Sequence, residues 1–243
     1  MNPTADMPMT YEPEDVVSYH GKLAEDWENR YQKKSFLARI VVLEECLQGL
    51  DLAGKEWLDA GCGTGTLSRY LATKGCRVIG VDASPRMIEI ARDHAQKDVR
   101  SAQMRFDAVQ KETIAQLPNA AASLDGILCS SVLEYMPNAE QCLASFARVL
   151  KPGGVLLVSV PNAQSVVRRA QANAHKLGRL LGRSWLDFIE YSRNEYSTSA
   201  FEALLRLQGF EAKTVITFGS PMPRWMQRQR WGGSLLMFLA VRK

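Results

Sequence analysis

The sequence is poor in histidine, and its only three, His20, His94 and His175, do not form a pair with metal-binding spacing. Its five cysteines are odd in number and share no such spacing either (Cys46, Cys62, Cys76, Cys129 and Cys142). Zinc sites draw on closely spaced Cys and His ligands, so we expect no metal. Free cysteines are typical of reducing compartments, and we therefore expect a cytoplasmic protein.

No apolar run is long enough to cross a bilayer, which takes about 20 residues. The first ten residues are polar, contain two prolines and lack the apolar centre of a secretory signal. We expect residues 1–15 to be a disordered lead-in. Residues 16–243 have a usual size for one domain built around a single core.

Positive charge is unevenly distributed along the chain. The segment Ala163 to Lys243 holds 13 Lys/Arg against 5 Asp/Glu, whereas the remainder is mildly acidic. This asymmetry indicates an acidic substrate, a membrane surface or nucleic acid, or only a solvated helix face.

The middle of the chain alternates short apolar runs with amphipathic stretches. This alternation predicts right-handed crossovers and a parallel sheet that is covered by helices on both faces. The expected strands are Glu56–Ala60, Cys76–Asp82, Gln103–Asp107, Leu124–Ser130 and Val155–Val160, and the expected helices are Leu67–Thr73, Met87–Gln96 and Ala139–Leu150.

Both ends of the chain depart from this alternation. Val16–Arg30 and Ser35–Leu50 have helical periodicity and predict an N-terminal helical cap over residues 16–50. We expect residues 163–196, which begin with the basic helical stretch Ala163–Arg183, to form a lid insertion. A helix, Ala200–Gln208, and two closing strands, Phe210–Phe218 and Ser234–Val241, follow, with a helix-free loop between the strands.

A glycine loop joins the first strand to the first helix of the alternating region. Glycines at Gly61, Gly63 and Gly65 permit a tight turn and close approach of the backbone to a ligand. Dinucleotide-binding loops have the spacing G-x-G-x-x-G, and here Thr66 occupies the position of the third glycine. The next strand ends in Asp82, whose carboxylate is placed to accept hydrogen bonds from ribose hydroxyls. The loop therefore indicates a nucleoside ligand other than a dinucleotide.

Three segments resemble the motifs of class I S-adenosylmethionine-dependent methyltransferases: Leu58–Gly65, Val81–Ser84 and Leu150–Gly154. The N-terminal residues Tyr19, Ala24, Trp27 and Tyr31 are similar to a pattern in the small-molecule enzymes of ubiquinone and menaquinone biosynthesis. The resemblance implies an α/β fold, a Rossmann-like three-layer sandwich. Its seven-stranded, mostly parallel sheet would have its last strand antiparallel, with added N-terminal helices and a helical lid.

The resemblance also implies S-adenosyl-L-methionine as cofactor and a set of residues that bind it. Gly61 and Gly63 would face its methionine part, Asp59 its ammonium and Asp82 its ribose. The remaining implied cofactor-binding residues are Tyr19, Tyr31, Arg39, Gly65, Ala83, Met87, Asp107, Ala108, Ser130 and Ser131.

The methyl acceptor is less well defined by the sequence. We expect O-methylation of a hydroxylated aromatic, quinone-like or lipophilic small molecule, with His20, Glu134 and Tyr135 as candidate proton acceptors. Many relatives have histidine at the position of Tyr135, and the Asn/Asp-Pro-Pro-Tyr sequence of enzymes that methylate amino groups of DNA bases is absent.

Other readings remain open on the sequence alone. They are N- or C-methylation of a metabolite, RNA or protein methylation, which we expect less because no nucleic-acid-binding module is present, and a non-catalytic cofactor-binding partner subunit. A basic amphipathic lid with Arg168, Arg169, Lys176, Arg179 and Arg183 also indicates peripheral membrane contact. The oligomeric state is not defined.

Overall fold

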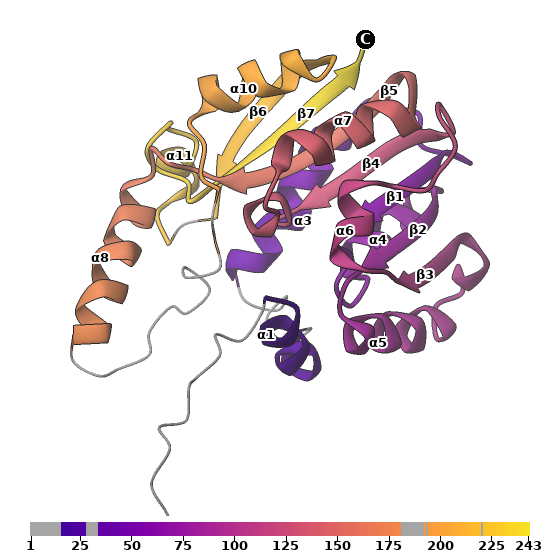
Figure 1. Cartoon of the computed structure of the whole chain (residues 1–243), viewed down its shortest axis with the longest axis horizontal. Coiled ribbons are helices and arrows are strands. Elements are labelled where there is room, and N and C mark those ends of the chain that lie inside the picture. The colour runs from indigo at the N-terminus through magenta and orange to yellow at the C-terminus, as the bar shows by residue number, and fades with distance from the viewer. Residues whose placement is uncertain (1–15, 28–33, 181–191, 193, 220) are drawn as a thin grey trace, which may run out of the picture.

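The computed structural model describes residues 16–27, 34–180, 192, 194–219 and 221–243. At its centre lies a seven-stranded sheet with the order β3-β2-β1-β4-β5-β7-β6 (Figure 1). The strands are β1 (Glu56–Ala60), β2 (Arg77–Asp82), β3 (Met104–Ala108), β4 (Leu124–Ser130), β5 (Leu150–Pro161), β6 (Phe210–Phe218) and β7 (Leu235–Arg242). The first five strands pair in parallel, and β7 runs antiparallel to both of its neighbours, as predicted.

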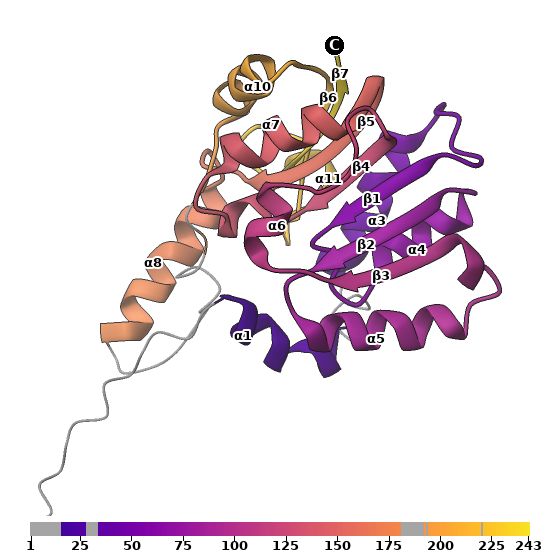
Figure 2. The same cartoon turned by 45° about the vertical axis from the view of Figure 1, so that its right-hand side comes forward.

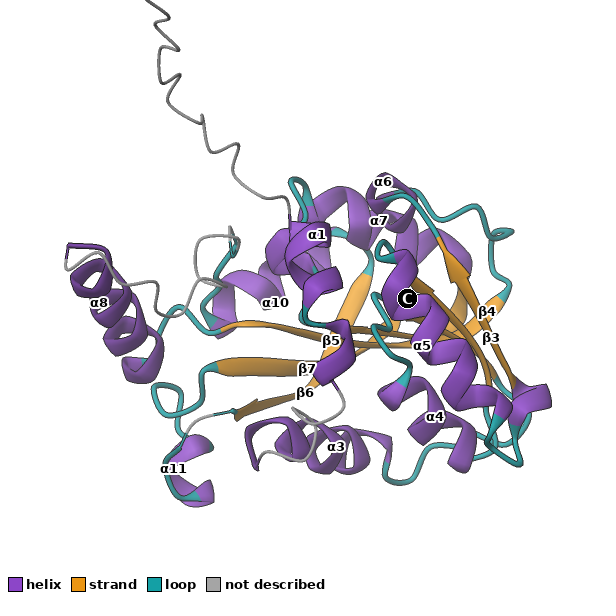
Figure 3. Cartoon of the chain, turned by 90° about the horizontal axis from the view of Figure 1, so that it is seen from below, coloured by secondary structure: helices purple, strands orange, loops and turns teal. Residues whose placement is uncertain are grey.

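Helices cover both faces of this sheet, which gives three layers (Figures 2 and 3). The helices α3 (Lys34–Leu47) and α4 (Thr66–Thr73) pack on one face, around the buried Trp57. The helices α6 (Lys111–Ala115), α7 (Ala139–Val149) and α10 (Thr198–Leu207) pack on the other. α5 (Pro85–Gln96) packs against Phe106 of the edge strand β3. The Rossmann-like sandwich expected from the sequence is confirmed.

The helices α5 and α10 each begin two residues before the predicted start, directly after a serine that caps the first turn. The Ser84 hydroxyl accepts a hydrogen bond from Met87 N at the start of α5, where Pro85 occupies the first helical position. The Ser197 hydroxyl does the same for Ala200 N at the start of α10. Side chains that accept from the free N–H groups of the first turn stabilise helix starts by about 1 kcal/mol, so these boundaries were readable from sequence.

The N-terminal prediction of one helix over Val16–Arg30 was wrong. The structure has α1 (Val16–Lys22), followed by a 3₁₀ turn, η1 (Ala24–Asp26). Gly21 in the last turn of α1 weakens the helix there, because glycine has low helix propensity. Residues 28–30 lie outside the described part of the chain. The second helix, α3, begins one residue earlier than predicted.

Two boundaries in the second half of the chain also differ from the predictions. β5 begins at Leu150 and includes Gly153 and Gly154, whereas the predicted strand began only at Val155. The pairing of Leu124 with Leu150, followed by a register shift, extends the strand through these glycines. The loop between β6 and β7 contains a short helix, α11 (Arg224–Gln227), that starts after Pro223, so the prediction of a helix-free loop was wrong.

The predicted lid begins with α8 (Val166–Leu180), which extends away from the sheet (Figure 1). Residues 181–191 and 193 of the predicted lid insertion, and the predicted lead-in 1–15, lie outside the described residues. Within the described part of the chain, no helix is both long and apolar enough to cross a membrane.

Candidate active site

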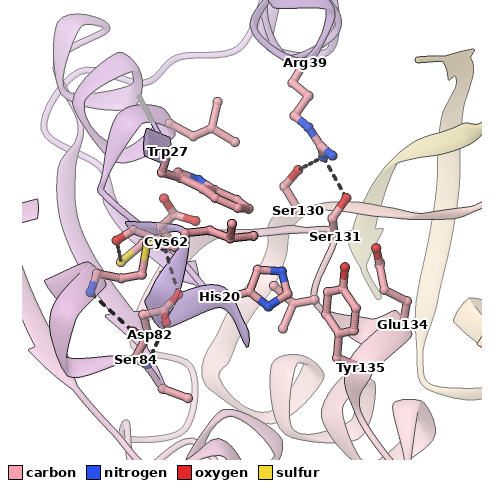
Figure 4. Close-up of a pocket in the computed structure, with 18 of the residues that line it drawn as sticks. His20, Trp27, Arg39, Cys62, Asp82, Ser84, Ser130, Ser131, Glu134 and Tyr135 are labelled. Carbon is pink, nitrogen blue, oxygen red and sulfur yellow. Dashed lines mark hydrogen bonds between the residues drawn. The ribbon is translucent and has the colours of Figure 1, made fainter. Parts of the chain in front are cut away.

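A cavity of about 400 Å³ opens at the carboxyl ends of β1, β2 and β4 (Figure 4). The strand order reverses between β1 and β4, and open α/β sheets bind ligands at such a switch point. The cavity is lined by residues from α1, the glycine loop, β4, the 3₁₀ turn η3 (Leu133–Tyr135), α8 and the closing strands. Its size suits a small-molecule ligand.

The glycine loop forms the floor of the cavity on the side of β1. Gly61, Gly63 and Gly65 all have positive φ, of 78°, 54° and 76°. A Cβ atom on Gly61 would lie 2.2 Å from Cγ2 of Val132, so only glycine fits beside the β4 loop. Gly61 and Gly63 line the cavity, whereas Gly65 caps α4 and is not among the lining residues.

Asp82 connects this loop to the start of α5. Its Oδ2 accepts a hydrogen bond from Gly63 N (2.9 Å), and its Oδ1 accepts one from Ser84 N (2.8 Å). Each carboxylate oxygen has room for a second donor, and Asp82 lines the cavity. Burial raises the pKa of Asp82, although the two backbone donors oppose this shift. The residue therefore both braces the loop and offers acceptors to a ligand.

Asp59 is almost completely buried at the end of β1, where it lines the same cavity. Its Oδ2 accepts a hydrogen bond from the Ser68 hydroxyl (2.6 Å). Burial raises the pKa of Asp59 to about 7, and the nearby Asp82 adds to the shift. A cationic ligand group beside this carboxyl would favour its charged form, which fits the ammonium of the implied cofactor.

The side chain of Arg39 reaches from α3 to the end of β4. It donates hydrogen bonds to the hydroxyls of Ser130 (3.2 Å) and Ser131 (2.7 Å), as Figure 4 shows. Ser131 has a positive φ of 58°, which is uncommon for serine and marks a constrained turn. The buried Ser159 of β5 accepts a hydrogen bond from Ser131 N (2.9 Å) and so supports this turn. The role of Ser159 could not be predicted from the sequence, because the residue lies inside an apolar strand.

The three candidate proton acceptors share one wall of the cavity. The ring of His20 lies edge-on to Tyr135, with centroids 5.2 Å apart, and to Trp27, 5.5 Å away (Figure 4). Glu134 is 5% exposed, and its Oε2 has no hydrogen-bond partner in the part of the chain that the structure describes. Burial raises the pKa of Glu134 to about 7, while Arg39 and Arg168 oppose the shift. Glu134 is thus a buried carboxyl that titrates near neutrality.

Some residues that the resemblance implied are not brought to this cavity. Asp107 forms ion pairs with Arg105 and Arg92 and lines a separate cavity of about 230 Å³ under α6, and Ala108 is exposed. Asp107 lies near the end of the edge strand β3, and its side chain has arginine neighbours on the surface. Ala83 and Met87 do line the main cavity. The side chain of Tyr19, and Tyr31 as a whole, fall outside what the structure describes.

Other lining residues were not predicted from the sequence. Arg168 and Gln171 reach the cavity from α8, and Gly219, Ser234 and Leu235 reach it from the closing strands. Only the tertiary fold brings these segments together, since no local pattern marks them. Among the described residues, no group of three or more His, Cys, Asp or Glu is arranged to hold a metal ion.

The fold and this cavity define a Rossmann-like α/β domain that binds a nucleoside ligand at its switch point. Residues 58–158 match the family model described as methyltransferase domain. Two ubiquinone biosynthesis O-methyltransferases are similar in sequence. The one from Xanthomonas oryzae is 34% identical over 58% of this chain and 59% of the relative, and the one from Coxiella burnetii is 37% identical over 58% of each.

The chain therefore spans about 58–59% of the curated relatives it matches. A solved SAM-dependent methyltransferase from Thermotoga maritima has the same fold, with a TM-score of 0.66, 23% identity, and coverage of 92% of this chain and 98% of that one. Residues 58–158 thus match a methyltransferase domain, in agreement with the motifs that indicated one.

Proposed function

We propose that the protein transfers a methyl group to a hydroxyl oxygen of a small aromatic acceptor, such as a catechol or a quinol. The observation that carries this proposal is Glu134, a buried carboxyl that lines the cavity and has one oxygen without a hydrogen-bond partner among the described residues. A phenol has a pKa of about 10 and gains from a proton acceptor when its oxygen attacks. The names of the two curated relatives support oxygen as the methylated atom.

When bound, S-adenosylmethionine supplies a methyl group that is already activated on a positively charged sulfur. The residues present fit this group, because Asp82 offers acceptors for ribose hydroxyls and the buried Asp59 suits the ammonium. Gly61 lets the loop backbone approach the ligand. Arg39, Ser130 and Ser131 would border its reactive end.

The protein's contribution to the reaction is to orient the acceptor and to take its proton. The Glu134 carboxylate accepts the hydroxyl proton as the oxygen–methyl bond forms and the sulfur–methyl bond breaks. Tyr135 and His20 form an aromatic wall against which an acceptor ring packs. Orientation contributes much of the rate, since holding two reactants in line is worth up to about 7–11 kcal/mol.

The direct test is methyl transfer from labelled S-adenosylmethionine to catechol and protocatechuate, with aniline and histamine as amine acceptors. We expect label in the methyl ethers of the two hydroxylated acceptors. Label only in the amines would contradict O-methylation and favour the N-methylation alternative. Label in neither set would contradict the small aromatic acceptor.

We also propose peripheral membrane contact through a docking face, defined here as the exposed residues Val166, Arg169, Lys176, Leu177, Trp225 and Trp231 of α8 and the α11 loop. A hydrogen bond from Val166 N to Trp231 O (3.0 Å) joins its two parts. Arg168, predicted on the basic lid, is instead 8% exposed and paired with Glu195, so it does not contribute. Tryptophan beside basic residues is typical of membrane interfaces.

This contact predicts that the full chain floats with vesicles rich in phosphatidylglycerol at low salt, and less so at high salt. Trp225→Ala combined with Trp231→Ala is expected to reduce the bound fraction several-fold. Leu207→Ala, which removes an exposed leucine on α10, is the matched control and should float as wild type does. Absence of wild-type flotation at low salt would refute the proposal.

A further inference from the structure

The turn that presents Glu134 has few supports of its own. In η3, Tyr135 N donates to Val132 O (2.9 Å) and Met136 N donates to Leu133 O (3.2 Å). Glu134 Oε2 has no hydrogen-bond partner among the described residues, so no such bond at this oxygen fixes the carboxyl. The backbone of the turn therefore contributes to the position of the carboxyl.

The side chain of Asn194, which does not line the cavity, holds this turn in place. Asn194 Nδ2 donates to Leu133 O (2.9 Å) and to Met136 O (2.8 Å), the carbonyls on either side of the two cavity residues. Both partners are carbonyl oxygens, so the atom that faces them must be the amide nitrogen. One amide group thus bridges both ends of the turn.

The backbone around Asn194 is itself firmly attached. The next residue, Glu195, forms the ion pair with Arg168 of α8. Tyr196 N donates to Pro161 O and Ala163 N donates to Tyr196 O, both at 3.0 Å, at the end of β5. The segment 194–196 therefore connects the lid helix, the sheet and the η3 turn.

We propose that Asn194 is a positioning residue that fixes the carboxyl of Glu134 against the cavity and couples it to the lid helix. The proposal rests on the proposed role of Glu134 as proton acceptor. Without the two hydrogen bonds, the turn loosens, water reaches the carboxyl, and the carboxyl moves from its place beside the acceptor. A displacement of about 1 Å is enough to lower a rate on the order of 100-fold.

The first test is a titration of Glu134 that needs no acceptor. The full chain carries ¹³C at its glutamate carboxyl carbons and is saturated with S-adenosylhomocysteine; the Glu134 resonance is the one that Glu134→Gln removes. We expect Asn194→Ala to lower the midpoint by at least about one pH unit, toward the value of about 4.3 for a solvated glutamate. If the alanine variant folds poorly, Asn194→Ser replaces it. The serine hydroxyl is too short to bridge both carbonyls, so we expect the same decrease of the Glu134 midpoint.

Asn162→Ala is the matched control, because Asn162 Nδ2 also bridges two carbonyl oxygens, those of Arg230 and Gly233, each at 2.8 Å. It should leave the Glu134 midpoint unchanged. An unchanged midpoint in the folded Asn194 variants would overturn the proposal, since a residue that only stabilises the fold does not move it.

The second test is a double-mutant cycle with catechol as acceptor. Asn194→Ala is expected to lower kcat about 10- to 100-fold in the wild-type background and less than about twofold in Glu134→Gln. Equal losses in both backgrounds would overturn the positioning role. Wild-type turnover by Glu134→Gln would instead refute the proposed function, while the titration would still report on the hydrogen bonds of Asn194.

Discussion

Asp82→Ala is expected to weaken the binding of S-adenosylhomocysteine at least 100-fold in a calorimetric titration. The Asp82 carboxylate is placed to accept hydrogen bonds from two ribose hydroxyls, and a hydrogen bond to a charged group contributes about 1.5–3 kcal/mol. The substitution also removes the acceptor of Gly63 N, which holds the glycine loop against β2. Lost ligand contacts and a loosened loop act in the same direction, so the effect is large.

The control for this experiment is Asp125→Ala near the amino end of β4, the end of the strand opposite to the cavity. Asp125 also accepts a backbone hydrogen bond, from Glu56 N (2.9 Å), and pairs with Lys151. Its removal is expected to lower stability and to leave the affinity for S-adenosylhomocysteine within about twofold. If both variants lost the same affinity, Asp82 would act only through the stability of the fold, and if neither did, its placement against the ribose would be wrong.

The parts of the site that are local in sequence could be predicted from it. The loop from Gly61 to Gly65 has its glycines where the backbone needs positive φ, and Asp82 lies where a parallel strand ends beside that loop. Ser84 followed by Pro85 marks the start of α5 for a chemical reason that acts within four residues. The alternation of apolar and amphipathic segments predicts the parallel sheet, because buried strands are apolar and the helices that cover them are amphipathic.

The parts that were missed, or that lie outside the main cavity, depend on contacts between distant segments. Asp107 follows the same local pattern as Asp82, yet it lies on an edge strand and pairs with surface arginines. The sequence pattern places Arg168 on the exposed basic face of an amphipathic helix. In the structure it pairs instead with Glu195, 27 residues later in the chain. Asn194 lies 58 and 61 residues from the carbonyls that it bridges. No spacing rule covers such separations.

Glu134 illustrates both cases, because its position after β4 was predicted while its chemistry comes from the fold. Burial raises the pKa of this carboxyl from its ordinary value of 4.5 to about 7. In the folded protein, the protonated form is favoured. The contribution of the protonated Glu134 side chain to the free energy of unfolding is therefore fully present below about pH 4.5 and is lost as the pH rises through 7. Glutamine, which is neutral and nearly the same shape, should avoid that loss.

We expect Glu134→Gln to lower kcat about 10²- to 10⁴-fold, the range that general base catalysis contributes. In the wild type, kcat should rise with pH and level off above about 7, because only the carboxylate accepts the proton. The residual rate of the variant should lack this rise. Glu140→Gln, an exposed glutamate on α7, is the matched control and should keep both the rate and the pH profile.

The same variant is expected to be more stable than the wild type at pH 8, by up to about 3 kcal/mol, and less so at pH 5. Asp59 also has a raised pKa, but it is present in both proteins and cancels in the comparison. Denaturant unfolding at the two pH values measures the difference. A variant that loses turnover while it gains stability assigns the buried carboxyl to the reaction, whereas loss of both would mean that Glu134 serves the fold.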